Sequence, residues 1–448
     1  MKKKNQKAYV IAVDMGYGHQ RAAYPLKDLS PNRTVINANT YSGIPKSDRD
    51  IWQQSREMYE FFSRFKKVPV VGELAWDIFD HFQKIEPFYP KRDLSEPSVQ
   101  LSSTYSLIKR KKWGKHLIDR LAKKPLPIIS TFFIPAFMAE IFNYPGDIYC
   151  LCTDTDVSRA WAPLNPRESK IKYFAPNHRV EQRLQMYGVK PENIFVTGFP
   201  LPEELIGGKK KSKLRENLSH RLYNLDPAKV YYKNFHESLK EQLGSSNFPP
   251  KKNHVLTLSF AVGGAGAQRE LGVEIIKSLR TEINKNRINI ILVAGVHKEI
   301  HDYFMKEIRK LGLTNELRQK KIHVLFSKTK QEYFRHFIVA LRRTDILWTK
   351  PSELSFYAAL GYPIIIADPI GSQEIFNRSW LKAIGAGTNM EDPRYTNQWL
   401  FDWLKSGWFA EAAMQGFLEA STSGTDNIKK IIQHRVEDAC DINTILQY

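Results

Sequence analysis

The hydrophobic and polar positions of the chain follow one repeated pattern. A short apolar run rich in β-branched residues is followed by a turn, and then by residues with the 3.6-residue period of a helix. Several runs are continuously apolar, for example VIAV at 10–13, VLTL at 255–258 and PIIIA at 363–367. Continuous runs are typical of parallel strands that are covered on both faces. The pattern therefore predicts βαβ units and an α/β protein with doubly wound sheets.

Eleven runs are predicted as strands, and they fall into two groups. Six lie in the first half of the chain, at residues 8–14, 34–39, 127–131, 147–154, 171–177 and 193–198. Five lie in the second half, at residues 254–260, 288–296, 321–327, 345–350 and 363–368. No further strand is predicted beyond Ile384, because the β pattern stops there and helical periods take over.

A chain of 448 residues is too long for one compact core and fits two domains. We predict one Rossmann-like domain over residues 1–206 and a second over residues 254–390. Between them, residues 207–253 begin with GGKKKSK and end with GSSNFPPKKN, which indicates a basic linker or insertion carrying a helix or two. Residues 391–448 are predicted as C-terminal helices.

The charge of the chain narrows the classes of partner. There are 67 Lys and Arg against 47 Asp and Glu, a net charge of +20. A field of this size draws a protein towards polyanions, either nucleic acid or an anionic membrane surface. A merely solvated basic surface is the plain alternative. Because no DNA- or RNA-binding module is recognisable, nucleic acid is not an expected partner.

Residues 51–113 show no strand pattern and many aromatic residues beside Lys and Arg. Such a stretch can form an interfacial membrane surface, or ordinary helices whose apolar faces lie in the core. No apolar run reaches the roughly 18–20 residues that cross a bilayer, and the first apolar run leads into a Gly-rich turn rather than a signal-peptide cleavage site. The three cysteines have no metal-ligand spacing. We therefore expect a cytoplasmic protein, with peripheral attachment to the inner face of the membrane.

Candidate chemistry lies in the turns after the strands, because ligands of doubly wound sheets bind outside the carboxyl ends of the strands. The first strand ends in DMGYGHQRAA, where Gly16 and Gly18 allow a tight turn and His19 begins a helix with a side chain suited to proton transfer. A turn that only packs, with a structural histidine, is the alternative.

The first strand of the second half runs into a Gly-rich loop and then a helix, an arrangement that cradles phosphate through backbone N–H groups. The loop matches neither the dinucleotide fingerprint nor the P-loop. Its candidate phosphate-binding residues are Gly263, Gly264, Ala265 and Gly266.

Two later turns carry further polar side chains. In the first, Lys350 can face phosphate and Glu353 can accept hydrogen bonds from a ribose, while Ser352 begins a helix. For Ser352 and for Gly371 in the second turn, helix capping is the structural alternative. The second turn also contributes Gln373, Glu374 and, one helical turn later, Asn377.

Four segments in a fixed order now carry a family resemblance: GYGHQRAA at 16–23, CTDTDVSRAW at 152–161, YGVKPENIFVTGFP at 187–200, and 349–377 with its TKPSE and GSQExxN. The chain resembles the glycosyltransferase superfamily that contains monogalactosyldiacylglycerol synthase, the processive diacylglycerol glucosyltransferases and the peptidoglycan lipid-intermediate N-acetylglucosaminyltransferase. The resemblance spans roughly residues 8–390.

The resemblance implies the GT-B architecture, in which two Rossmann-like domains face a cleft. The second domain would bind a nucleotide-sugar, usually a UDP-sugar, and the first would hold the acceptor, often a lipid. It implies no cofactor besides the donor. The loop with Gly263 would face the pyrophosphate, Ser327 would lie near the base, and His19 near the reacting centre. Contacts to sugar or phosphate would come from Gln373, Glu374 and Asn377.

The chain departs from the family pattern at two turns. Where the family has a ribose-binding glutamate, counted back from Pro363, this chain has Phe356. Ser352 and Glu353 stand where glycines are expected, and the segment is about two residues short. Either Glu353 takes over the ribose contact or the donor site is altered. The turn at 295–297 also differs from the family's usual sequence.

Asp154-Thr155-Asp156 follows a strand and has the Asp-x-Asp spacing of the metal clamp in the other glycosyltransferase fold. The resemblance places this segment in the acceptor domain, so no metal site is expected. Asp154 is predicted as an acceptor-site carboxylate or as the partner of a base, with loop capping as the alternative.

These residues lead to one hypothesis and three rivals. The hypothesis is an inverting, metal-independent sugar transfer in which His19 or Asp154 takes the proton of an acceptor hydroxyl, with a membrane lipid as a candidate acceptor. The first rival is a nucleotide-sugar 2-epimerase of the same fold. The second is a protein that binds a nucleotide-sugar or anionic lipid without catalysis, and the third, prompted by charge alone, is nucleic-acid binding.

Overall fold

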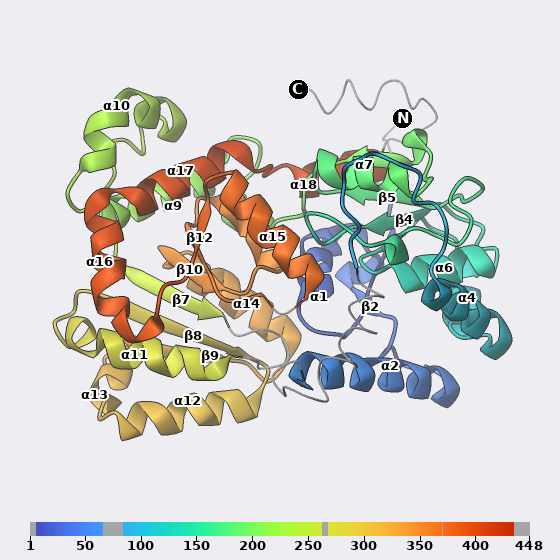
Figure 1. Ribbon diagram of the computed structural model, residues 1–448, viewed down its shortest axis with the longest axis horizontal. Coiled ribbons are helices and arrows are strands. Elements are labelled where there is room, and N and C mark those ends of the chain that lie inside the picture. The colour runs from blue at the N-terminus through green and yellow to red at the C-terminus, as the bar shows by residue number, and fades with distance from the viewer. Residues whose placement is uncertain (1–5, 66–83, 262–267, 370, 434–448) are drawn as a thin grey trace. The chain divides into compact units, whose positions relative to one another are not determined.

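A computed structural model describes residues 6–65, 84–261, 268–369 and 371–433, and its chain divides into two compact units. Unit 1 comprises Met1–Leu201, Ile370–Asn377 and Thr422–Tyr448, and unit 2 comprises Pro202–Pro369 and Arg378–Ser421. Each unit contains one parallel six-stranded sheet with helices beside it (Figure 1). The prediction of two Rossmann-like α/β sheets is confirmed.

The unit bounds differ from the predicted ranges in several respects. Ile370–Asn377, predicted within the second domain, group with unit 1. The basic insertion at 207–253 groups with unit 2, and the residues from Thr422 onwards group with unit 1 although they follow unit 2 along the chain. As predicted, the insertion carries two helices, α9 (Ser212–Leu225) and α10 (Val230–Leu243).

The sheet of unit 1 has the order β2-β1-β3-β4-β5-β6, with every neighbouring pair parallel. Its strands are β1 (Tyr9–Ala12), β2 (Ile36–Asn37), β3 (Ile128–Ser130), β4 (Ile148–Leu151), β5 (Lys172–Ala175) and β6 (Ile194–Val196). Its helices are α1 (Gly18–Ala23), α2 (Lys46–Phe65), α4 (Val99–Lys111), α5 (Lys115–Ala122), α6 (Phe133–Ile141), α7 (His178–Met186) and α18 (Gly424–Gln433).

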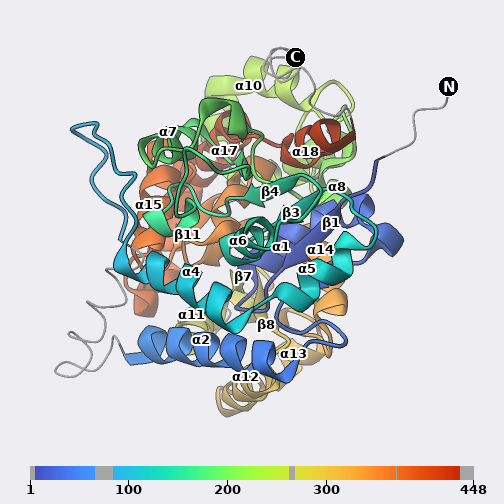
Figure 2. The same ribbon diagram turned by 90° about the vertical axis from the view of Figure 1, so that its right-hand side faces the viewer.

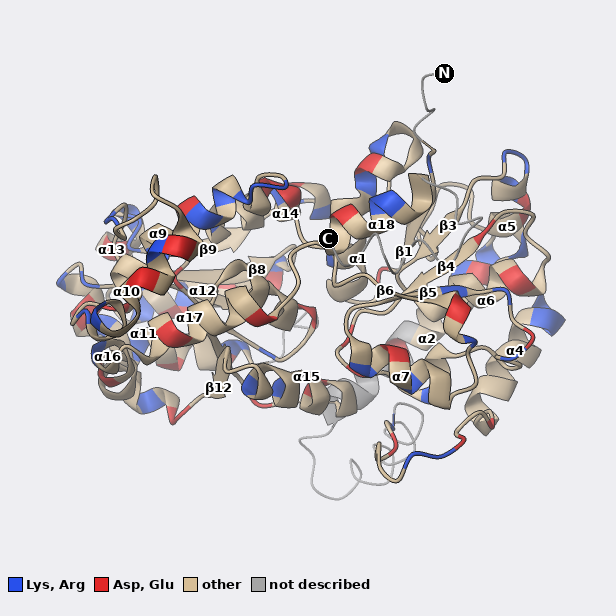
Figure 3. Cartoon of the chain, turned by 90° about the horizontal axis from the view of Figure 1, so that it is seen from above, with Lys and Arg blue, Asp and Glu red and all other residues tan. Residues whose placement is uncertain are grey.

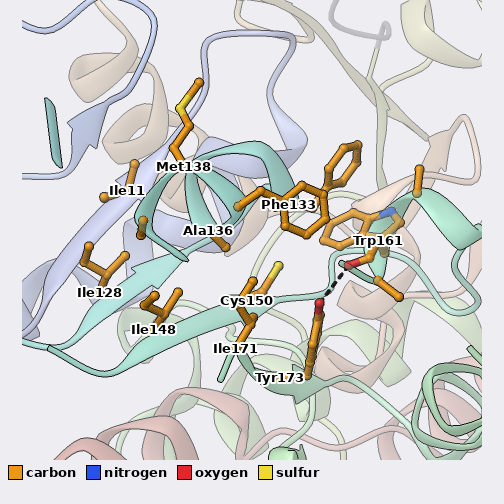
Figure 4. Packing of buried hydrophobic residues seen from close by; sticks show 14 of the residues in the cluster. Ile11, Ile128, Phe133, Ala136, Met138, Ile148, Cys150, Trp161, Ile171 and Tyr173 are labelled. Atoms are coloured by element: carbon orange, nitrogen blue, oxygen red, sulfur yellow. Dashed lines mark hydrogen bonds between the residues drawn. The ribbon is translucent and has the colours of Figure 1, made fainter. Parts of the chain in front are cut away.

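The core of unit 1 lies between this sheet and the helices beside it. Ile11, Ile128 and Ile148 from adjacent strands pack with Phe133 and Met138 of α6 (Figure 4). Figure 2 shows α4, α5 and α6 together on one side of the sheet. The core also contains a hydrogen bond, which the buried Tyr173 hydroxyl donates to the Trp161 carbonyl at 2.9 Å.

Two of the cysteines belong to this core. Cys150 and Cys152 are free thiols and fully buried, and burial raises the pKa of each thiol. They therefore act as small apolar side chains in the core at and just beyond β4.

The sheet of unit 2 has the order β12-β11-β10-β7-β8-β9, again parallel throughout. Its strands are β7 (Thr257–Ala261), β8 (Asn289–Gly295), β9 (Ile322–Phe326), β10 (Ile346–Thr349), β11 (Ile364–Ile366) and β12 (Gly387–Asn389). Besides α9 and α10, its helices are α8 (Glu203–Ile206), α11 (Arg269–Asn284), α12 (Lys298–Lys310), α13 (Thr314–Arg318), α14 (Lys330–Leu341), α16 (Thr396–Ser406) and α17 (Trp408–Glu419). The residues of α15 (Ser372–Ala383) are shared between the two units.

Each of the eleven predicted strands overlaps an observed strand, and ten of them contain it; β7 begins three residues later than predicted and ends one residue later. The prediction that no strand follows Ile384 is wrong, because β12 pairs in parallel with β11 at the edge of the sheet. Its three residues, Gly-Thr-Asn, contain no apolar run from which a strand could be predicted.

Where the stretch at 51–113 is described, residues 51–65 and 99–111 are helical and residues 84–98 have no regular secondary structure. Residues 66–83, which include part of its aromatic and basic sequence, lie outside the described residues. Within the described ranges, no helix combines the length and the apolar character that a membrane-spanning segment needs.

Candidate functional site

The Gly-rich turn after β1 is fixed to the turn after β2. Gly16 has a φ of +103°, a conformation that a residue with a Cβ adopts only with strain, so glycine is required there. The Asp14 backbone N–H donates to the Asn39 side-chain oxygen at 2.8 Å, and the Asn39 amide donates back to the Asp14 carbonyl at 3.2 Å. Gly18 then begins α1, and His19 follows at the carboxyl edge of the sheet.

His19 is held by the loop after β3. Its Nδ1 lies 2.7 Å from the Thr131 carbonyl oxygen. A carbonyl oxygen only accepts hydrogen bonds, so Nδ1 must carry the proton of that bond. In the neutral ring the lone pair then belongs to Nε2, which makes Nε2 the basic atom. The ring also packs against Phe132, with centroids 4.8 Å apart, so its orientation is fixed from two sides.

Asp154 follows β4 and is oriented by Asn377. The Asn377 side chain is fully buried, and its Nδ2 donates to Asp154 Oδ1 at 2.9 Å. Its Oδ1 accepts from both the backbone N–H and the hydroxyl of Thr155 at 2.9 Å each. These two donors fix which end of the amide faces Asp154. All three residues belong to unit 1.

Asp156 has a different role from Asp154. Its carboxylate is 1% exposed and forms a two-bond pair with the buried Arg183, at 2.9 and 3.0 Å, and a further bond with Arg179 at 2.9 Å. The two aspartates of the Asp-x-Asp motif thus have separate partners. Among the described residues, no group of three or more His, Cys, Asp or Glu side chains is arranged to hold a metal ion.

The carboxyl edge of the unit 2 sheet carries four of the predicted donor-site residues. Ser327 is the first residue after β9, and its hydroxyl lies 2.9 Å from His336 Nδ1. The register pairs Thr349 with Ala261, so Lys350 leaves the sheet at the same edge as the chain after β7. Glu353, 7% exposed, begins the buried 3₁₀ helix η5 (Glu353–Leu360), with Ser352 as its N-terminal flanking residue.

The predicted phosphate-binding loop and the predicted ribose contact of the donor site both stay predictions. The loop that contains Gly263, Gly264, Ala265 and Gly266 lies outside the described residues. Phe356, which stands where the resemblance expects the ribose-binding glutamate, is buried in η5 and packs against Trp380 with ring centroids 5.3 Å apart. Phe356 is therefore a core residue, and Glu353 remains the candidate for the ribose contact.

The turn from Gly371 into α15 contains an unsatisfied acceptor. A Cβ added at Gly371 would lie 2.9 Å from the side-chain oxygen of Gln373, so the turn is closely packed. That oxygen, Oε1, is buried and accepts no hydrogen bond from any residue that the structure describes. Glu374 is 7% exposed beside it. A buried acceptor without a donor favours a ligand that supplies one.

His19, Asp154 and Asn377 could be predicted from the sequence, but the residues that hold them could not. Thr131 and Thr155 are the missing partners. Thr131 is the first residue after β3 and Thr155 the fourth after β4, so both lie beyond the carboxyl ends of strands, where ligand sites of this kind of sheet are expected. The predicted contact of Asn377 with sugar or phosphate stays a prediction, since the bonds described here join its amide to Asp154 and Thr155.

Comparison with known proteins adds sequence relatives. A family model described as "Domain of unknown function (DUF6938)" matches residues 250–406. The chain is 20% identical over 387 residues to the processive diacylglycerol β-glucosyltransferase of Bacillus subtilis (strain 168), covering 85% of this chain and 82% of that protein. It is 23% identical over 394 residues to the protein of the same name from Bacillus mycoides (strain KBAB4), covering 87% and 83%. These matches confirm the resemblance found in the sequence.

Solved structures with a related arrangement include MurG from Acinetobacter baumannii, with a TM-score of 0.44, 13% identity, and coverage of 96% of this chain and 99% of that one. Another is UDP-GlcNAc 2-epimerase from Neisseria meningitidis bound to UDP-GlcNAc, with a TM-score of 0.42, 14% identity, and coverage of 79% and 83%.

Proposed function

We propose that this chain is a glycosyltransferase that moves a sugar from a UDP-sugar to an acceptor hydroxyl with inversion at the anomeric carbon. The observation that carries the proposal is the bond from His19 Nδ1 to the Thr131 carbonyl, which leaves Nε2 as a base at a ligand-binding edge of the sheet. Sequence similarity to processive diacylglycerol β-glucosyltransferases over 85% of the chain supports the reaction class.

In the proposed reaction, His19 Nε2 accepts the proton of the acceptor hydroxyl. The hydroxyl oxygen forms a bond to the anomeric carbon while the bond from that carbon to the diphosphate oxygen breaks, and the nucleoside diphosphate leaves with the electron pair. Asp154, held by Asn377, accepts a hydrogen bond from the acceptor and orients it. A positioned base of this kind contributes about 10²–10⁴-fold to the rate.

Unit 2 binds the donor in this proposal. Lys350 contacts the diphosphate as a point charge, Glu353 accepts hydrogen bonds from the ribose hydroxyls, and Ser327 lies near the base. Support comes from their shared position at the carboxyl edge of one parallel sheet, where doubly wound folds bind nucleotides.

A membrane lipid is the proposed acceptor class. The names of the Bacillus relatives point to diacylglycerol. The net charge of +20 favours an anionic membrane surface, and Figure 3 shows Lys and Arg on helices of both units. The protein would then act as a peripheral protein at the inner face of the membrane.

Replacing Lys350 with alanine is expected to weaken UDP binding about tenfold or more, because a charge-assisted bond to phosphate is worth about 1.5–3 kcal/mol. Isothermal titration calorimetry of both proteins with UDP measures the effect. Lys382→Ala, at an exposed position of α15, is the matched control and should bind UDP as the unmodified chain does. Equal affinities for UDP in all three proteins would show that Lys350 does not contact UDP.

A further inference from the structure

A hollow of about 350 Å³ lies within unit 2, where the chain enters α9 beside the last turns of α10 and α17. It is formed by helices and not by the carboxyl ends of the strands, so it is separate from the proposed donor site. Among the described residues its lining holds four cations, no carboxylate and one aromatic ring: Lys209, Lys210, Lys211 and Arg215, with Gln242, Phe417 and Leu418.

Five of the seven residues that line the hollow belong to the basic insertion at 207–253, for which the proposed sugar transfer has no use. This insertion contains eleven Lys and Arg against four Asp and Glu, a net charge of +7 out of +20 for the chain. Neighbouring Lys213 pairs with Glu216 at 3.0 Å. Across the described part of the chain, by contrast, no ion pair joins any of the four lining cations to a carboxylate.

Lys211 and Arg215 are the most confined of the four. Lys211 is half-buried, and its Nζ lies 5.8 Å from the centre of the Phe417 ring. Burial, and then the nearby charge of Arg215, lower the pKa of Lys211. Arg215 lies one helical turn further on, and its buried Nε donates to no described acceptor. Like charges brought together without a partner destabilise the fold unless an anion binds between them.

The ends of α10 and α17 offer a simpler explanation. Both helices finish at this hollow, and carbonyl groups at the carboxyl end of a helix attract cations. If those carbonyl groups were the reason for the cluster, Lys211 would stabilise the protein by itself, and its removal would lower stability. If the cluster is an anion site, removal of Lys211 should instead raise stability. Residues of like charge that bind a ligand repel one another in its absence, and this repulsion lowers the stability of the fold.

We propose that this hollow binds a multiply charged phosphate anion, held by Lys209, Lys210, Lys211 and Arg215. The Arg215 guanidinium offers several N–H donors in a planar fork that matches phosphate oxygens, and the lysines add compact point charges. The volume of about 350 Å³ admits a phosphate or pyrophosphate group. That group belongs either to a soluble phosphate compound or to the headgroup of a lipid, and Phe417 and Leu418 line the same hollow.

The binding test compares the unmodified chain with the double variant Lys211→Met, Arg215→Met, using pyrophosphate in isothermal titration calorimetry. Methionine keeps the volume of both side chains and removes their charges. We expect the double variant to lose the hollow's pyrophosphate binding, with a dissociation constant at least about tenfold weaker. Lys213→Met is the control and should bind as the unmodified chain does. Any pyrophosphate binding at the proposed donor site should be the same in all three proteins, because none of the substitutions lies there. The test is therefore independent of the proposed function.

The lipid source is tested by co-sedimentation with vesicles of phosphatidylcholine that contain phosphatidate, and with vesicles of phosphatidylcholine alone. Binding to the phosphatidate vesicles that is lost in the double variant but not in Lys213→Met supports a headgroup ligand. Binding of pyrophosphate alone with the same dependence supports a soluble ligand. The proposal is overturned if neither probe distinguishes the double variant from the control.

A stability measurement separates binding from a structural role. In buffer without phosphate, Lys211→Met is expected to raise the melting temperature, because it relieves repulsion from Arg215. Pyrophosphate should raise the melting temperature of the unmodified chain more than that of the variant, since a ligand that binds only the folded state stabilises it. A lower melting temperature for Lys211→Met, with an unchanged response to pyrophosphate, would support the helix-end explanation and contradict the proposal.

Discussion

Replacing His19 with alanine is expected to lower the turnover number of sugar transfer about 10²–10⁴-fold, the contribution of a positioned general base. The Thr131 carbonyl fixes the tautomer that carries its proton on Nδ1, which makes Nε2 the basic atom. Alanine has no imidazole ring, so the substitution removes this base. The donor is proposed to bind on unit 2, so its affinity should change little. Steady-state rates with a UDP-sugar and lipid vesicles, together with a UDP titration, measure both quantities.

The matched control is His178→Ala, because the His178 side chain is 81% exposed and, among the described residues, forms an ion pair with Glu181 alone. Its rate should stay within a factor of about two of the unmodified chain. If His19→Ala keeps the full rate, His19 is not the base, and Asp154→Asn becomes the deciding variant. If that variant also keeps the full rate, both assignments are wrong.

Asp156→Ala is expected to lower the free energy of unfolding by about 3–5 kcal/mol, the usual effect of removing one partner of a buried ion pair. The substitution leaves Arg183, whose side chain is fully buried, without its carboxylate. Burial acts to lower the pKa of Arg183, but its hydrogen bonds and its attraction to Asp156 outweigh burial and raise that pKa. Without Asp156, a charged guanidinium would remain uncompensated in the core.

Urea unfolding followed by far-UV circular dichroism measures this loss, with Asp119→Ala as the control. Asp119 pairs with Lys115 on the surface of α5, where both side chains are about half exposed. Such a surface pair is worth about 0–1 kcal/mol. Equal losses for Asp156→Ala and Asp119→Ala would show that the Asp156–Arg183 pair does not stabilise unit 1.

The strands were predictable because parallel strands covered on both faces need continuous apolar runs. INIILV at 288–293 and PIIIA at 363–367 each gave a strand of the unit 2 sheet. β12 was not predictable by this rule, since an edge strand of Gly387–Asn389 needs no apolar run to pair with β11. The other edge strands, β2, β6 and β9, do lie within predicted runs, so the hydrophobic pattern fails here only for a short edge strand that has no apolar run.

The candidate site was predictable as a set of positions but not as a set of bonds. His19 lies in the turn and helix that follow β1, and Asp154 lies in the turn that follows β4. Both were selected because ligands of doubly wound sheets bind outside the carboxyl ends of the strands. The partners of Asp154 and Asp156 could not be found in this way, because Asn377 lies 223 residues from Asp154 along the chain. Arg183 pairs with Asp156 from the helix that follows the next strand. Those contacts depend on how elements pack, and a single sequence does not encode them in any local pattern.

The central claim is that the chain transfers sugar from a UDP-sugar, and the most direct test is a transfer assay with purified full-length protein. The protein is incubated with radiolabelled UDP-glucose, UDP-galactose or UDP-N-acetylglucosamine and with vesicles containing diacylglycerol, and the label is followed into the lipid phase. We predict label in lipid from one donor, with release of UDP in equal amount, and loss of both in His19→Ala. Binding of UDP without transfer, or conversion of UDP-N-acetylglucosamine to its 2-epimer with no labelled lipid, would contradict the account.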